Sequence, residues 1–537
     1  MSKKINTKYL YLVLLTALAT QLFLQWNYTL AWGDSFVQFE MAYQWYLGEG
    51  LQLCETYTND LSQNLCSNKL LWPPGCPLLL KVFFPIFKDF IITGRFLDCV
   101  GITLLLILHF KILQLVEFPR KATFLIFLLF TVSLSPFRYL FSTDLWSMLA
   151  YEFCIWHALI VLKKKSQGWF ATMLLALSIF SMVFFKYMYY NLCIVPSCFL
   201  IIGFIKSDHK LVKQAFGLIG LLGIFTFLYF WWMTEYTGQV IPLSKLETGY
   251  FWRHLLQVDS YAFRSLIYTS NIHKYLTIHE MTDHWIKMIL IVGELISSFI
   301  IIWLITYLVF WKKKVLSHLS EDYLKNSYFI LIILTILFST GYLGALSVVY
   351  RWSNGWTYIA ETRYYAPSMI GILTLFIYLC TQSGLPVLYR FISRSLLIFT
   401  FLFATIYASY RIVAVSFLGH DNYNIYHLYD ELWEVNTQVP QLVKEIQTSQ
   451  RPIVFSAADA RTSQYTYFSG SSQIELGKIL EDGVHTSRPI TLLLYIPEKN
   501  YQKEYATILK NRTHRILRRV KKRGMIYVQV DVESTSK

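Results

Sequence analysis

Repeated apolar runs, each long enough to cross a lipid bilayer, constrain this chain more than any other feature. About eleven such runs are centred near residues 20, 105, 132, 153, 177, 198, 223, 298, 338, 374 and 400. Only 15% of the 537 residues are charged, whereas a soluble protein carries about a quarter. The sequence therefore predicts a polytopic α-helical membrane protein with about 11 transmembrane helices. The first run is over about 20 residues long, which favours a retained span over a cleaved signal peptide.

Basic residues beside the apolar runs predict the orientation. Under this count they fall on one face of the membrane, at Lys3-Lys4, Arg120-Lys121, Lys163-Lys164-Lys165, Lys206 to Lys213, Lys312-Lys313-Lys314, and Arg390 with Arg394. The positive-inside rule makes that face cytoplasmic and places the N-terminus there. These anchors account for the net charge of +15, so nucleic acid is not an expected partner. Compact loops favour a bacterial plasma (inner) membrane.

The opposite face receives the long polar segments. We expect a transmembrane domain over residues 1–412, with a first external loop at 32–77 and a second large external loop at 235–283. Residues 421–537 have the composition of a soluble extracytoplasmic α/β domain. Its expected order is a strand in RPIVFSA, a helix in SSQIELGKILEDG, a strand in RPITLLLYIP, a helix over 501–520 and a strand in MIYVQVDV.

Asp34 is the strongest candidate for a catalytic group. It follows the first apolar run and precedes a stripe of Phe36, Phe39, Ala42, Tyr43 and Tyr46 at helical spacing. A carboxylate at this boundary can be partly desolvated, which suits a general base. The alternative is an N-cap on a helix that begins at Ser35. The two roles are compatible. The loop closes at 72–75, where two prolines exclude a continuous helix.

Asp144 is a second outward acid, at the start of the fourth span. It could cap that span, or face Asp34 and bind an acceptor or a metal ion. Glu152, eight residues further, would lie about 12 Å into the bilayer and must face the bundle interior or a wet cavity. His157 is expected to be a satisfied core histidine.

The predicted outer face also carries basic residues, although the positive-inside rule favours them on the cytoplasmic face. They are Lys69, Arg95, Arg138, Lys186, Lys245, Arg253, Arg264, Arg351 and Arg363. Such a set suits a lipid phosphate, for which Arg offers bidentate geometry. Ordinary surface charge and local pairs, such as Arg95 with Asp98, are the alternative. Arg363 lies at the membrane boundary in ETRYYAPSM, where the tyrosines could instead form an aromatic belt.

Eight cysteines show no CxxC pair and no zinc spacing. Cys54 and Cys66 lie in the polar part of the first external loop, where an oxidising compartment would allow a disulfide between them. We assign no metal site and no certain cofactor. A divalent metal has no support in the sequence.

Five segments, in order, resemble the GT-C membrane glycosyltransferases, and specifically the protein O-mannosyltransferases and lipid A aminoarabinose transferases. They are GDSFVQFEMAYQWYLGEG, WPPGCPLLL, GRFLDCVG, TDLWSMLAY and ETRYYAPSM, and the architectural resemblance covers roughly residues 1–410. This chain departs from the family pattern at two positions. The mannosyltransferases carry an Asp-Glu pair in the first loop, whereas here Ser35 follows Asp34. Many relatives have Glu at the position of Asp144.

The resemblance implies transfer of a sugar from a polyprenyl-phosphate carrier to a lipid, glycan or protein acceptor on the extracytoplasmic face, with inversion. It implies that Asp34 deprotonates the acceptor, while Arg363 contacts the carrier phosphate and Tyr364 lines the same pocket. Lys69, just before WPPG, is placed as a second phosphate contact. The competing functions are a transporter or flippase for a lipid-linked saccharide, and a non-catalytic scaffold whose terminal domain recruits partners.

Overall fold

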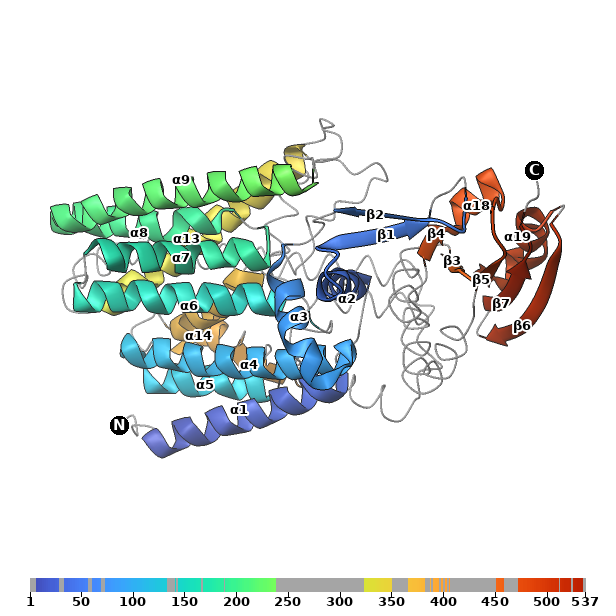
Figure 1. Ribbon diagram of the computed structural model, residues 1–537. Helices are drawn as coiled ribbons and strands as arrows, with labels where there is room; N and C mark the ends of the chain where they lie inside the picture. Colours follow the sequence, from blue (N-terminus) through green and yellow to red (C-terminus); the bar gives the residue numbers. More distant parts are fainter. Residues whose placement is uncertain are drawn as a thin grey trace.

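The computed structural model has a helical bundle, a short hairpin beyond one end of it, and a small β-sheet domain (Figure 1). It describes residues 6–28, 33–56, 60–68, 73–132, 141, 143–165, 168–187, 189–237, 323–349, 366–381, short pieces between 387 and 405, 451–457, 472–510, 512–522 and 525–534. The second large external loop and the segment from 406 to 450 lie outside the described residues.

The bundle is built from long apolar helices. Their bounds are α1 Thr7–Tyr28, α4 Phe90–Leu115, α5 Arg120–Val132, α6 Thr143–Lys164, α7 Trp169–Phe185, α8 Asn191–Lys206, α9 His209–Thr237, α13 Tyr323–Val349 and α14 Ala366–Thr381. Within the described ranges, four helices are long and apolar enough to cross a membrane, starting at residues 7, 92, 143 and 209. The protein is therefore a membrane protein. The predicted spans near 298 and 400 fall largely outside the described residues, so the count of eleven stays a prediction.

Lysines gather at one end of the bundle. Helix α6 has 22 residues, about 33 Å at the helical rise, and runs from Asp144 in its first turn to Lys164 in its last. Beyond its lysine end, Lys165, Lys206 and Lys210 line a cavity of about 740 Å³. This is the distribution that the positive-inside rule predicts for a cytoplasmic end.

Two short helices lie across the other end of the bundle. They are α2 (Gly33–Tyr46) and α3 (Gly75–Phe87), and α3 starts at the predicted proline break, directly after Pro74 (Figure 1). The expected apolar stripe of α2 is confirmed at Phe39 and Ala42, which are fully buried, and at Tyr43, which packs against their cluster. It does not extend to Tyr46, which is 45% exposed at the end of the helix. Between the two helices, β1 (Gln52–Thr56) and β2 (Asn64–Asn68) form an antiparallel hairpin.

The C-terminal domain is a five-stranded mixed sheet in the order β4-β3-β5-β7-β6. The strands are β3 Ile453–Ala457, β4 Ser472–Glu475, β5 Ile490–Pro497, β6 His514–Lys522 and β7 Met525–Val532. Helices α18 (Leu476–Asp482) and α19 (Tyr501–Ile508) pack on it, and η4 (Glu498–Asn500) precedes α19. Alternate residues of β5 and β7 fill the core, as a half-buried strand requires.

All three predicted strands in this domain are confirmed, as β3, β5 and β7. The two predicted helices are partly wrong. The segment from Ser472 to Glu475 is a strand because it pairs in parallel with β3, and only the following seven residues are helical. The predicted helix over 501–520 ends at Ile508, because the next segment pairs with β7 as an antiparallel edge strand. In both places sheet pairing overrides local helix propensity.

Candidate active site

The helices that carry the two candidate acids meet at the end of the bundle nearest the sheet. Phe39 of α2 and Trp146 of α6 belong to one buried cluster, which also contains Cys76 of α3 and Leu97 of α4. Asp34 lies about one and a half turns before Phe39 on α2, and Asp144 lies two residues before Trp146 on α6. The fold thus brings the start of α2 and the start of α6 to one region.

Asp34 lies inside the first turn of α2, because the helix begins at Gly33. The expectation of a helix starting at Ser35, with Asp34 as its N-cap, is therefore displaced by two residues. The first turn is in general a favourable position for an acidic residue, because the positive end of the helix dipole lies there.

Asp144 forms a buried ion pair with Lys186. Asp144 is in the first turn of α6, and Lys186 directly follows the last residue of α7, so the antiparallel pairing of the two helices brings them together. Their side chains are only 11% and 4% exposed. The carboxylate is engaged by the ammonium group, so Lys186 is a paired cation, which agrees with the alternative of local pairs among the predicted outer cations.

Asp98 of α4 is a further buried acid, which its spacing in the sequence suggested only as a partner for Arg95. Its Oδ2 accepts a hydrogen bond of 3.2 Å from Gln25 Nε2 and one of 2.7 Å from the backbone N–H of Phe141. The expected local pair with Arg95 is not formed, and Arg95 instead interacts electrostatically with Asp89. An acid six residues inside an apolar run was the signal that could have identified Asp98 as buried.

Cys76 is fully buried in the same cluster as Leu97 and Trp146, which are neighbours in sequence of Asp98 and Asp144. Cys76 is the second residue of α3, so the closing segment of the first external loop packs near the helix segments that carry these two acids. The neighbouring Gly75 has no room for a side chain, because a Cβ there would lie 2.6 Å from the carbonyl oxygen of Phe184. The glycine after the two prolines therefore allows the loop to close against α7.

Glu152 lies deeper in α6 and faces the bundle interior, as predicted. Its Oε2 is 3.1 Å from His109 Nδ1, and His109 Nε2 is 3.1 Å from the Thr374 hydroxyl. All three side chains are buried, and together they link α4, α6 and α14. His157 is the expected satisfied histidine, with Nδ1 3.2 Å from the Ser178 hydroxyl.

The remaining site residues stay predictions. Lys69, Arg363 and Tyr364, which were assigned to the donor phosphate, lie outside the described residues. Arg95 is described and half-buried near the start of α4, at the same end of the bundle as Asp144. Within the described ranges, no group of three or more His, Cys, Asp and Glu residues is close enough to hold a metal ion.

No protein-family model matches the chain, and no curated protein sequence matches it. Among solved structures, it resembles those of the Archaeoglobus fulgidus oligosaccharyltransferase. The complex with Zn and sulfate is 10% identical with a TM-score of 0.48, and the match covers 93% of this chain and 69% of that one. The apo form is 9% identical with a TM-score of 0.47, over 94% and 71%.

A third structure, of the archaeal oligosaccharyltransferase AglB from Archaeoglobus fulgidus with an inhibitory peptide and a dolichol-phosphate, is 9% identical. Its TM-score is 0.44, over 93% of this chain and 70% of that one. TM-scores below 0.5 identify neither the reaction nor the substrates of this chain.

Proposed function

We propose that this chain is an integral-membrane glycosyltransferase. It moves a sugar, with inversion, from a polyprenyl-phosphate carrier to a lipid, glycan or protein acceptor. The reaction takes place at the end of the bundle that carries Asp34 and Asp144, which we assign to the extracytoplasmic face of a bacterial plasma membrane. The proposed donor is of the same chemical class as the dolichol-phosphate solved with the archaeal enzyme.

The buried cluster that joins α2, α3, α4 and α6 carries the proposal. Phe39 and Trp146 lie in one buried cluster, and each is close in sequence to a candidate acid. The opposite end of the bundle carries Lys165, Lys206 and Lys210, as the positive-inside rule expects of a cytoplasmic face. Carboxylates near the predicted outer boundary, on rigidly packed helices, are placed where a lipid-linked donor and a water-soluble acceptor could meet.

In the proposed mechanism, Asp34 removes the proton from the acceptor hydroxyl as it attacks the anomeric carbon. The bond to the carrier phosphate breaks on the opposite side of the sugar, which inverts the configuration. Phosphate is already a good leaving group, so no paired acid is needed to protonate it, in contrast to glycoside hydrolysis. The protein has to position the two substrates and stabilise the phosphate charge.

The other residues take supporting roles in this proposal. Arg95, Lys69 and Arg363 neutralise the phosphate, and Tyr364 lines the same pocket. Asp144 is held by Lys186, so its carboxylate is positioned and charge-balanced, and we assign it to orienting the acceptor rather than to removing its proton. The domain boundaries at 1–412 and 421–537 are part of the same proposal.

The proposal is tested by incubating the purified full chain in lipid nanodiscs with labelled polyprenyl-phosphate sugars. Transfer to an added acceptor, or slow release of free sugar to water, supports a transferase. A transporter predicts binding without either product, and movement of the labelled lipid between leaflets once the chain is reconstituted in vesicles. That result would overturn the proposed function.

The buried Glu152 is an observation that favours the transporter. Intramembrane carboxylates often mark transport pathways. Here, however, Glu152 is hydrogen-bonded to His109, and His109 to Thr374, inside a packed core. The network therefore supports a structural link between α4, α6 and α14.

A further inference from the structure

The β1–β2 hairpin reaches the C-terminal domain (Figure 1), and a residue just before β2 packs into the core of that domain. The hairpin belongs to the first external loop, which begins at the candidate base and ends at α3. At its tip, Leu61 is fully buried and packs in the same core cluster as Val454 of β3 and Ile479 of α18. A residue separated from that domain by almost 400 positions thus completes its hydrophobic core.

Asp60 fixes this insertion through hydrogen bonds to both sides of the contact. From the domain, Ser487 donates its backbone N–H to Asp60 Oδ1 at 3.0 Å and its hydroxyl to Oδ2 at 2.6 Å. From the hairpin, Ser62 donates its N–H and its hydroxyl to Oδ1 at 3.1 and 2.7 Å, and Gln63 Nε2 donates to Oδ2 at 2.8 Å. The backbone N–H of Leu61 donates to the carbonyl oxygen of His485 at 2.7 Å.

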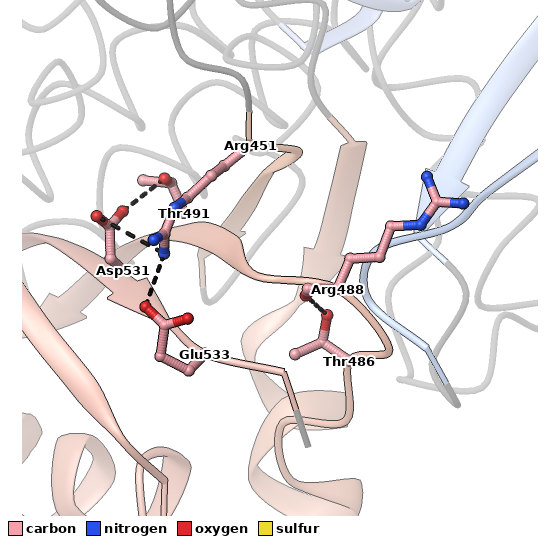
Figure 2. Close-up of polar contacts among 6 residues, drawn as sticks. All are labelled: Arg451, Thr486, Arg488, Thr491, Asp531 and Glu533. Carbon is pink, nitrogen blue, oxygen red and sulfur yellow. Dashed lines mark hydrogen bonds and ion pairs between the residues drawn. The ribbon is translucent and has the colours of Figure 1, made fainter. Parts of the chain in front are cut away.

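The segment of the domain that receives the tip is itself held in shape. The Thr486 hydroxyl donates to the carbonyl oxygen of Arg488, which closes the turn around Ser487 (Figure 2). The strand that follows is tied down by a 2.7 Å hydrogen bond from the Thr491 hydroxyl to Asp531 (Figure 2). Arg451 also bridges Asp531 and Glu533, at 3.9 and 3.1 Å. The tip therefore docks on a rigid surface.

The base of the hairpin is attached to the bundle. The backbone N–H of Leu51 donates to the Tyr236 hydroxyl on α9 at 2.5 Å. The preceding Gly50 has a φ of +89°, and a Cβ there would lie 2.6 Å from the same hydroxyl, so glycine is required. Leu51 and Leu53 pack with Met41 of α2 in one buried cluster. The hairpin therefore packs directly against α2, the helix that carries Asp34.

We propose that the contact of Asp60 and Leu61 with the C-terminal domain is a latch that holds the first external loop in its working position. Asp60 is then a positioning residue for the reaction proposed above, and the inference rests on that proposed function. The domain acts through the hairpin and α2, and touches neither substrate. A molecule that binds or displaces the C-terminal domain therefore also changes the position of Asp34.

The latch is tested first by hydrogen exchange on the full chain in nanodiscs, comparing wild type with Asp60→Ala. We expect the backbone amides of Leu61 and Ser487 to exchange at least about tenfold faster in the variant, because a charged acceptor of several hydrogen bonds is removed. Glu481→Ala, which removes an exposed carboxylate from α18 of the same domain, is the matched control and should exchange as wild type does.

A cross-link separates positioning from general destabilisation. The hydroxyl oxygens of Ser62 and Ser487 are 3.1 Å apart, so cysteines at both positions can form a disulfide across the latch. In Asp60→Ala we expect the transfer rate to fall about tenfold with an unchanged KM for the donor. Adding Ser62→Cys and Ser487→Cys should restore the rate under oxidising conditions and lose it again on reduction. Reduced wild type controls for the other cysteines.

Unchanged exchange at Leu61 and Ser487 in Asp60→Ala would overturn the latch. So would a released tip with an undiminished transfer rate, or a cross-link that restores exchange protection without restoring transfer. If wild type transfers no sugar at all, the proposed function fails. The latch is then upheld or overturned by the exchange comparison, with and without the cross-link.

Discussion

Asp144 and Lys186 form a buried ion pair, so substitution of either residue affects the stability of the protein as well as any role in the reaction. Each ion loses hydration when it enters the protein, and their mutual attraction roughly repays that cost only while both are present. A single substitution at either position would therefore reduce activity through misfolding, whatever the catalytic role. The two effects can be separated by changing both residues together.

We predict that Lys186→Met lowers the free energy of unfolding by about 3–5 kcal/mol, because it leaves the Asp144 carboxylate buried and unpaired. Asp144→Leu combined with Lys186→Met should recover most of that loss. Thermal unfolding in detergent measures both. If the double variant regains stability but does not transfer sugar, Asp144 has a role in the reaction. A double variant as unstable as the single one would contradict this account of the pair.

Asp60 predicts a pH dependence. Burial by itself would raise the pKa of this carboxyl, but the hydrogen bonds donated by Ser487 and Ser62 outweigh it and hold the pKa well below its usual 3.8. Because the folded-state pKa is depressed, the stabilisation is complete above pH 3.8 and is lost only as the pH falls below it towards the folded-state pKa.

We therefore expect the difference in melting temperature between wild type and Asp60→Asn to be constant from about pH 7 to pH 5. It should shrink as the pH falls below about 4. Taking the difference between the two proteins cancels the titration of groups that they share. A difference that already shrinks between pH 6 and 5 would show that the carboxyl is not stabilised in its charged form.

Among the elements, those set by hydrophobic periodicity were predicted and those set by strand pairing were not. Helix α2 could be predicted because its apolar stripe repeats at helical spacing. Strand β5 could be predicted because its apolar run is short and bounded by Pro489 and Pro497. The β1–β2 hairpin could not be predicted, since its strands QLCET and NLCSN carry no clear alternation and are ordered by their contacts at both ends.

The hairpin register bears on the predicted disulfide. Cys54 and Cys66 are directly opposite partners in the antiparallel pair, where Cα atoms lie about 4.5–5.5 Å apart, within the range that a disulfide spans. We predict that protein isolated from an oxidising compartment has these two cysteines linked. Peptide mapping under non-reducing conditions should recover them as one cross-linked peptide. Alkylation of both thiols without prior reduction would contradict the prediction.

At the scale of the whole molecule, a membrane bundle and a soluble sheet are connected by a segment from the first external loop. Composition predicted both bodies, because apolar runs of about 20 residues and a polar α/β segment are unambiguous. Their connection could not be predicted, because Asp60 and Ser487 are more than 400 residues apart and neither lies in a recognisable motif. The pair formed by Asp144 and Lys186 was missed for the same reason, since it depends on how α6 and α7 are packed.

The most direct test of the proposed function is the rate of sugar transfer by Asp34→Asn in nanodiscs. The substitution is nearly isosteric and removes the base, so we expect the transfer rate to fall by at least about 100-fold. The melting temperature and donor binding should be unchanged. Glu49→Gln, which neutralises an exposed carboxylate in the same loop, should transfer as wild type does. Wild-type activity in Asp34→Asn would contradict the assignment of the base, and with it the mechanism proposed for this site.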